Sequence, residues 1–150
     1  MRLRGFEIIS CYKNADISLP VRRTQYSAGY DIAAAEEVIL LKATVTIIAT
    51  GLKAYMCSDE YMGIHIRSGL SIKNNLSLIN GQGIIDADYY NNTDNEGHIL
   101  IAVYNYNDQD ILISKGTRIA QGIFYKYLVT DTDENNLLIN RSGGFGSTGE

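Results

Sequence analysis

The stretch Gly81-Gln82-Gly83-Ile84-Ile85-Asp86-Ala87-Asp88-Tyr89-Tyr90 lies just past the middle of the 150-residue chain. Its two glycines accept backbone torsions that other side chains forbid, so the chain can turn back tightly here. The pair Ile84-Ile85 then anchors the returning arm in a core. In a strand, Asp86 and Asp88 point to the same face because successive side chains alternate.

This stretch fits two interpretations. Taken alone, a glycine-rich turn followed by Asp residues describes an ordinary hairpin. The same hairpin also presents bare backbone, then a carboxylate, then an aromatic ring, and this combination suits a flat ligand. The backbone can read the edge of such a ligand, the ring can pack on it, and the carboxylate can act on it.

The rest of the chain favours strands. Tyr, Ile, Val and Thr recur in short runs, and no segment has the long 3.6-residue apolar period of a helix. From 61 to 66, Met62, Ile64 and Ile66 alternate with His65 on the opposite side. Frequent turns between short runs predict an all-β sandwich or jelly roll. The expected strands are 6–9, 38–41, 44–50, 52–57, 61–66, 76–80, 98–106, 111–113, 118–129 and 137–139.

Length and composition limit the class of protein. A chain of this length fits one domain, residues 1–150. No apolar run approaches the roughly 20 residues of a membrane span, and Met1-Arg2-Leu3-Arg4 is not followed by a signal-peptide core. Cys11 and Cys57 are isolated and form no metal-ligand or disulfide-framework pattern. We therefore expect a reduced, intracellular, cytoplasmic protein without a membrane partner.

The net charge of −4 argues against a nucleic-acid partner, because such a surface needs a basic stripe. An anionic ligand would require basic residues concentrated locally. Arg67-Ser68-Gly69-Leu70-Ser71-Ile72-Lys73 is one such place, where Ser68 suits a helix N-cap and Asn74-Asn75 suits the helix end. A serine, N–H groups and an arginine at a helix start form an anion site. Taken alone, the segment fits a capped helix with a surface arginine better.

Several other polar residues also have plain alternatives. Asp31 lies among small and apolar residues, where it fits a turn-capping residue of a strand. His65 and His98 lack partner motifs and fit surface or interface histidines better than general bases. Arg118 and Gln121 fit solvent-facing strand residues.

The C-terminal segment 140–150 contains 4 of the chain's 14 glycines, so ordering it is costly. It fits a disordered end. However, Arg141, Phe145, Ser147 and Thr148 interrupt the glycines with a cation, a ring and two hydroxyls, and this mixture fits a mobile lid over a nucleotide. No Gly-Lys-Ser/Thr follows the glycines, so the segment is not a Walker motif.

Five segments, in order, closely resemble the five ordered motifs of trimeric dUTPases. They are Ala28-Gly29-Tyr30-Asp31, Arg67-Ser68-Gly69-Leu70, Gly83-Ile84-Ile85-Asp86-Ala87-Asp88-Tyr89, Arg118-Ile119-Ala120-Gln121 and Arg141-Ser142-Gly143-Gly144-Phe145-Gly146-Ser147-Thr148-Gly149. The resemblance runs from about Leu19-Pro20 to the C-terminus. It implies a distorted jelly-roll-like β-sandwich with one short helix and a flexible glycine-rich arm, 140–150, that acts as a lid.

The resemblance also implies an activity, that of a homotrimeric, Mg²⁺-dependent dUTP diphosphatase. Such an enzyme converts dUTP to dUMP and pyrophosphate, which limits uracil incorporation into DNA and supplies dUMP for thymidylate synthesis. By the same resemblance, Asp86 is the general base and Tyr89 packs under the deoxyribose. The residues implied to contact uracil are Asn80, Gly83, Ile84 and, by stacking, Phe145.

The remaining motif positions are implied to serve the triphosphate. Those that match phosphate-contacting positions are Arg67, Ser68, Gly69, Gln121, Arg141, Gly146, Ser147 and Thr148. Arg118 matches a structural support position. Asp31 matches the carboxylate that holds Mg²⁺ through water, as an outer-shell ligand.

The chain departs from the commonest family pattern in two places. Ile66 stands where many relatives have proline, and the polar loop 90–97 is longer than usual. Two other functions stay open. A related deaminase family acts on dCTP with a glutamate base, whereas this chain has Asp86. A non-catalytic nucleotide-sensing or partner-binding homologue would be expected to lose Asp86 or the glycine-rich tail.

Overall fold

The computed structural model describes residues 2–133, which contain eleven strands, one α-helix and two 3₁₀-helices. None of these helices has the length and apolar character that a membrane crossing requires. In chain order the elements are β1 Gly5–Ile8, η1 Ser10–Tyr12, β2 Tyr30–Ala33, β3 Val38–Leu40, β4 Val45–Ala49, β5 Leu52–Tyr55, β6 Glu60–Ile66, α1 Ser68–Asn74, β7 Leu76–Leu78, β8 Gly83–Asp86, η2 Ala87–Tyr89, β9 Leu100–Asn105, β10 Ile111–Ile113 and β11 Arg118–Lys126.

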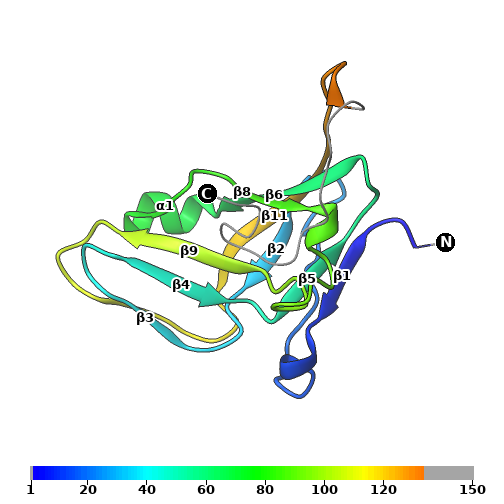
Figure 1. Ribbon diagram of the computed structural model, residues 1–150. Coiled ribbons are helices and arrows are strands. Elements are labelled where there is room, and N and C mark those ends of the chain that lie inside the picture. The colour runs from blue at the N-terminus through cyan, green and yellow to red at the C-terminus, as the bar shows by residue number, and fades with distance from the viewer. Residues whose placement is uncertain (1, 134–150) are drawn as a thin grey trace.

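All strand pairs in this part of the chain are antiparallel. They form a four-stranded sheet in the order β2-β11-β6-β8, a three-stranded sheet in the order β4-β9-β7, and the pairs β1-β5 and β3-β10. Figure 1 shows the β4-β9 layer beside the larger sheet, with β1 and β5 at one end. The predicted all-β fold with one short α-helix is therefore confirmed.

The core lies between these layers and draws on every sheet. On β6 the predicted alternation holds, because Met62 and Ile64 are buried while His65 is only half-buried. The larger sheet also contributes Ile32, Ile119 and Ala120, and the layers facing it contribute Leu40, Ile48, Leu76, Leu78, Ile101, Val103 and Ile113. Removing these side chains from water supplies the main driving force for folding, at roughly 25 cal/mol per Å² of apolar surface.

The turn around Gly81 differs from the predicted hairpin. Gly81 has a positive φ of +69°, as a tight turn requires. However, β7 pairs with β9 and β8 pairs with β6, so the two arms of the turn belong to different sheets. The prediction of a paired hairpin is wrong, because each apolar arm is buried in its own layer of the sandwich. The turn therefore carries the chain from one sheet to the other.

The helix α1 ends as predicted and begins differently. Asn75 adopts left-handed torsions (φ 50°, ψ 50°) and stops the helix. The predicted N-cap, Ser68, is instead the first helical residue, and Arg67 takes the capping position with extended torsions and no side-chain capping bond. The Arg67 carbonyl accepts bonds from the N–H groups of Leu70 and Ser71, both at 3.0 Å.

Other strand ends also differ from the sequence-based expectation. The strand expected at 98–106 begins only at Leu100, because His98 lies in the preceding turn. The strand expected at 118–129 ends at Lys126. The strand expected at 137–139 lies outside the described residues.

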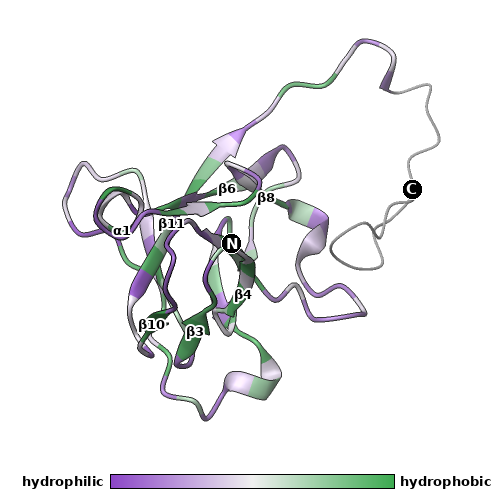
Figure 2. Cartoon of the chain, turned by 90° about the vertical axis from the view of Figure 1, so that its left-hand side faces the viewer, coloured by the Kyte–Doolittle hydropathy of each residue, from purple (hydrophilic) through white to green (hydrophobic). Residues whose placement is uncertain are grey.

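One outer face of the sandwich carries exposed apolar side chains. Ile39 on β3 and Leu112 on β10 lie directly opposite each other and are 55% and 57% exposed. Val45 and Ile47 on β4 are also exposed. Figure 2 shows β3 and β10 in the green of hydrophobic residues. Surface of this kind is typical of contacts between proteins.

We predict that Asn105→Leu lowers the free energy of unfolding by at least about 2 kcal/mol. Asn105 is fully buried, and its Nδ2 donates to the carbonyls of Leu40 and Gln109, both at 3.0 Å. Leucine has a similar size but leaves these buried carbonyls without their donor. Urea denaturation measures the change, with the exposed Asp108→Asn as control. Equal stability of the two variants would contradict this role.

Candidate functional site

A cavity lies where β7 and β8 separate. Its lining includes Leu78, Asn80, Gly83, Ile84, Tyr89 and Ala102. Among the described residues β7 and β8 are each the edge strand of their sheet, so each has one side to which no strand of residues 2–133 is paired. Edge strands leave backbone N–H and C=O groups available for other partners. The cavity therefore combines an apolar lining with backbone groups that suit the edge of a flat, polar ring.

The four residues that the resemblance implies for uracil and deoxyribose, apart from Phe145, thus line one cavity. Gly83 permits this arrangement, because a Cβ there would lie 3.1 Å from the Cβ of Ile64 on β6. Tyr89 is buried, with 6% of its surface exposed. Phe145 lies outside the described residues.

Gln82 tethers the turn above this cavity, a role that the sequence did not predict. Its amide nitrogen lies 3.2 Å from His65 Nε2. The Tyr125 hydroxyl also lies 3.2 Å from His65 Nε2. Gly63 makes room for this contact, because a Cβ there would lie 2.4 Å from the Gln82 amide nitrogen. His65 is thus part of a polar group on the outer face of the larger sheet.

Asp86 ends β8, opposite Tyr61 at the start of β6. It is half-buried and lines an open hollow that also contains Glu60, Asp88 and Tyr127. Strand β8 therefore both lines the cavity, through Gly83 and Ile84, and carries Asp86 at its end.

A second cluster of charges lies at the opposite end of the same sheet. Asp31 Oδ2 accepts bonds from Arg118 Nη1 at 2.8 Å and Arg23 Nε at 3.2 Å, and Arg67 Nε lies 3.4 Å from Asp31 Oδ1. Burial alone would raise the pKa of Asp31. Hydrogen bonds from Arg118 and Arg23, with the charge of Arg67, outweigh burial and lower that pKa. The carboxylate is therefore held ionised among three guanidinium groups.

The sequence prediction included three of these four residues. It missed Arg23. The sequence gives no sign of this contact except that Arg23 lies eight residues before Asp31, in the segment that leads into the strand. Gln121 joins the cluster from β11, where it lies between Asp31 on β2 and His65 on β6. Gly29 packs on it so closely that a Cβ would lie 2.3 Å from Gln121 Oε1.

Ser68 and Gly69 follow Arg67 in the first turn of α1. Apart from its chain neighbours and the backbone of α1 itself, no atom of the described residues lies within 4 Å of the place where a Gly69 Cβ would sit. Nothing in this part of the chain therefore requires glycine at position 69. The predicted phosphate-binding residues Arg141, Gly146, Ser147 and Thr148 lie outside the described residues.

The two clusters are far apart within one chain. Asp86 lies opposite Tyr61, whereas Arg67 follows the other end of β6. Tyr61 and Arg67 are six positions apart, which at ~3.4 Å per residue corresponds to about 20 Å. Figure 1 shows α1 at one end of this sheet and β8 running toward the other. Asp86 and Arg67 of one chain therefore lie at opposite ends of the sheet, with Arg67 Nε 3.4 Å from Asp31 Oδ1.

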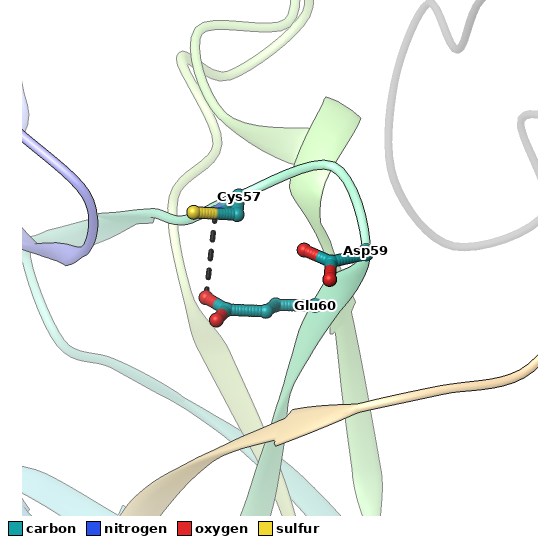
Figure 3. Close-up of side chains that lie close together, drawn as sticks. All are labelled: Cys57, Asp59 and Glu60. Carbon is teal, nitrogen blue, oxygen red and sulfur yellow. Dashed lines mark hydrogen bonds between the residues drawn. The ribbon is translucent and has the colours of Figure 1, made fainter.

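One group in residues 2–133 has the composition of a metal site, namely Cys57, Asp59 and Glu60 (Figure 3). Both carboxylates already have cationic partners. Arg4 donates two bonds to Glu60, which lowers the pKa of that carboxylate. Lys126 lies 2.8 Å from Asp59. The group is therefore an ion-pair network that fastens β6 to the N-terminal segment and β11.

His98 is a half-buried histidine behind the cavity. Its Nε2 accepts a bond from the Gly51 N–H at 3.0 Å, so this nitrogen carries no proton. The ring of Tyr12 lies beside it, with centroids 5.5 Å apart. Burial lowers the pKa of His98 below its ordinary value of 6.5, and the charge of Glu36 offsets only part of this effect.

Comparisons with known proteins identify the family. The dUTPase family model matches residues 15–149. The chain is similar to the deoxyuridine 5'-triphosphate nucleotidohydrolase of Lactococcus lactis subsp. lactis (strain IL1403), with 50% identity over 99% of both chains. It is 40% identical to the enzyme of the same name from Rickettsia akari (strain Hartford), over 91% of this chain and 92% of the relative.

A solved structure has the same fold. The crystal structure of dUTPase from Streptococcus mutans superposes with a TM-score of 0.81 and 41% sequence identity. The match covers 85% of this chain and 98% of that one. The β-sandwich is thus the dUTPase fold.

We predict that His98 makes stability depend on pH in a window below 6.5. In this window His98 binds a proton in the unfolded chain but stays neutral in the folded chain, because its pKa is lower there. The free energy of unfolding therefore falls as the pH drops through the window. Paired carboxylates such as Glu60 act only at lower pH, near and below their ordinary 4.5.

Thermal unfolding between pH 7.5 and 5 measures this slope. His98→Gln should flatten it, because glutamine keeps an acceptor near the Gly51 N–H and does not titrate. His65→Gln is the matched control for the other histidine. A slope that persists in His98→Gln and disappears in His65→Gln would show that the assignment is wrong.

Proposed function

Because the chain belongs to the dUTPase family, we propose that it hydrolyses dUTP to dUMP and pyrophosphate. This reaction would limit uracil incorporation into DNA and supply dUMP for thymidylate synthesis. We also propose that residues 1–150 form a single domain, as the family match over 15–149 suggests. We propose that the protein is intracellular and cytoplasmic.

One observation carries this proposal most directly. The cavity between β7 and β8 is lined by Asn80, Gly83, Ile84 and Tyr89. Asp86 follows on the same strand. The backbone around Asn80, Gly83 and Ile84 would bind the donor and acceptor pattern of uracil. Cytosine presents the opposite pattern, and the tight turn leaves no room for the methyl group of thymine.

The proposed chemistry is in-line hydrolysis at the α-phosphorus. Asp86 accepts a proton from a water molecule as the water oxygen bonds to the α-phosphorus. The bond from this phosphorus to the bridging oxygen then breaks, and pyrophosphate leaves with the bonding electrons. General-base catalysis of this kind contributes about 10²–10⁴-fold to a rate. The phosphate contacts would come from Arg67, Ser68, Gly69 and Gln121, with Arg118 holding Asp31 in place.

The residues around Asp31 fit a hydrated Mg²⁺ in a limited way. Among residues 2–133, Oδ2 accepts bonds from Arg118 and Arg23, whereas Oδ1 has Arg67 Nε at 3.4 Å. This leaves one oxygen for a metal-bound water, as Mg²⁺ bound mainly by phosphates and waters requires. When bound, the ion would offset the charge that develops on the phosphate oxygens.

We propose that the protein is a homotrimer whose active sites draw on neighbouring subunits. The distance of about 20 Å between Asp86 and Arg67, at ~3.4 Å per residue of β6, supports this arrangement. The exposed apolar side chains on β3, β4 and β10 provide surface for subunit contacts. The arm 140–150 would close over the nucleotide, with Phe145 stacking on uracil and Arg141, Gly146, Ser147 and Thr148 binding phosphate.

Product analysis tests this function. The protein is incubated with dUTP, dCTP, dTTP or UTP and Mg²⁺, and the products are separated by chromatography. We expect dUMP and pyrophosphate from dUTP, and loss of turnover when the metal is chelated. Deamination of dCTP would indicate the related deaminase activity instead. Binding of dUTP without turnover would indicate a nucleotide-sensing homologue.

We predict that Asp86→Asn lowers kcat by at least about 10²-fold, as expected for loss of a general base. The amide keeps the shape of the carboxylate but does not accept the proton of water. Binding of a non-hydrolysable dUTP analogue, measured by calorimetry, should persist and show that the cavity is intact. A variant that keeps more than about a tenth of the rate would exclude Asp86 as the base.

A further inference from the structure

The loop 90–97 folds back onto Tyr89. Asn92, which is 7% exposed, donates from Nδ2 to the Tyr89 carbonyl at 2.8 Å. Its Oδ1 accepts the N–H groups of Asp94 and Asn95, at 3.0 and 3.1 Å. Gly97 has a φ of +82°, and a Cβ there would lie 2.6 Å from the Tyr89 carbonyl oxygen. The loop is thus built around the residue that precedes it.

Asn95 extends these contacts to the phenol end of the same side chain. Its Nδ2 donates to the Tyr89 hydroxyl at 2.8 Å, and that hydroxyl donates to the His98 carbonyl at 2.8 Å. The Asn95 Oδ1 accepts from Asn92 Nδ2 and from the Gly97 N–H, at 2.9 and 3.0 Å. These two acceptor bonds orient the amide so that its NH₂ group faces the tyrosine.

The loop is itself fastened to the body of the protein. The Glu96 carboxylate accepts bonds from the N–H and the hydroxyl of Ser10, at 3.2 and 3.0 Å. Lys53 lies 3.5 Å from Glu96 and donates to Asn91 Oδ1 at 2.6 Å. Asn95 is therefore presented from a fixed support, and its position does not depend on Tyr89 alone.

Tyr89, which is among the residues that line the cavity, is held at both ends. The backbone is fixed by Asn92 and Gly97, and the hydroxyl is fixed by Asn95 and the His98 carbonyl. A ring that is held at its hydroxyl cannot shift to admit a larger ligand without breaking these bonds. The hydroxyl bonds therefore determine how rigidly this wall of the cavity resists an extra atom.

We propose that Asn95 is a positioning residue that fixes the Tyr89 ring and thereby sets discrimination between 2′-deoxyribose and ribose. This rests on the proposed function, in which Tyr89 packs under the sugar of dUTP. In this way the loop 90–97 contributes to the selectivity of the site for 2′-deoxyribose.

The test measures kcat/KM for dUTP and UTP in Asn95→Ala, Tyr89→Phe and the double variant. Both single variants lose the bond between Asn95 Nδ2 and the Tyr89 hydroxyl, and this shared loss should lower the dUTP/UTP ratio by about two- to tenfold in each. Tyr89→Phe keeps the ring and removes only the hydroxyl. In its background Asn95→Ala should therefore cause no further loss of selectivity.

The matched control is Asp94→Asn, an exposed position in the same loop, which should keep the wild-type ratio. Thermal unfolding separates selectivity from folding. A lower melting temperature of Asn95→Ala with an unchanged dUTP/UTP ratio would overturn the inference, as would additive losses in the double variant. If Asn95→Ala fails to fold, Tyr89→Phe alone decides, and an unchanged ratio there overturns the inference.

Tyr89→Ala separates the inference from its premise. If truncating the ring leaves the ratio unchanged, Tyr89 does not contact the sugar, and both the premise and the inference fail. If Tyr89→Ala relaxes the ratio while Asn95→Ala and Tyr89→Phe do not, the premise stands and the positioning role of Asn95 fails. Turnover of dUTP by the unaltered protein is measured in parallel and reports the proposed activity itself.

Discussion

Strand β6 is hydrogen-bonded to β11 on one side and to β8 on the other, and this pairing sets the spacing of Asp86, Gly83 and Arg67. Its first residues lie beside Asp86, its middle lies beside Gly83, and its last residues lead to Arg67 and α1. Tyr61, opposite Asp86, and Arg67 are six positions apart, which corresponds to about 20 Å at ~3.4 Å per residue. This separation supports the proposed sharing of each active site between neighbouring chains.

The same sheet order also creates the cavity. Because β7 and β8 end their sheets within the described residues, the turn at Gly81 joins two edges that separate from each other. Gly83 lets β8 lie close to Ile64 on β6. Gly63 leaves room for the Gln82 side chain, whose amide nitrogen contacts His65. The charged cluster lies at the far end of the sheet, where three arginines lower the pKa of Asp31 and keep it charged.

The predictable features were those set by neighbours in the sequence. The left-handed torsion of Asn75, the turn at Gly81 and the alternation of Met62 and Ile64 each follow from local backbone chemistry or strand geometry. The partners of β7 and β8 depend on strands far away in the chain, so no local pattern specified them. The contacts of Arg23 with Asp31 and of Asn95 with the Tyr89 hydroxyl also depend on side-chain placement by the tertiary fold.

Complementation between two inactive variants tests the shared site most directly. Asp86→Asn and Arg67→Ala chains are unfolded, mixed in equal amounts and refolded together, and dUTP hydrolysis is compared with each variant refolded alone. If each site takes Asp86 from one subunit and Arg67 from its neighbour, random assembly restores about a quarter of the wild-type sites in a cyclic oligomer. The account predicts this recovery. Mixed oligomers that form, as mass spectrometry can verify, but stay as inactive as the separate variants would contradict it.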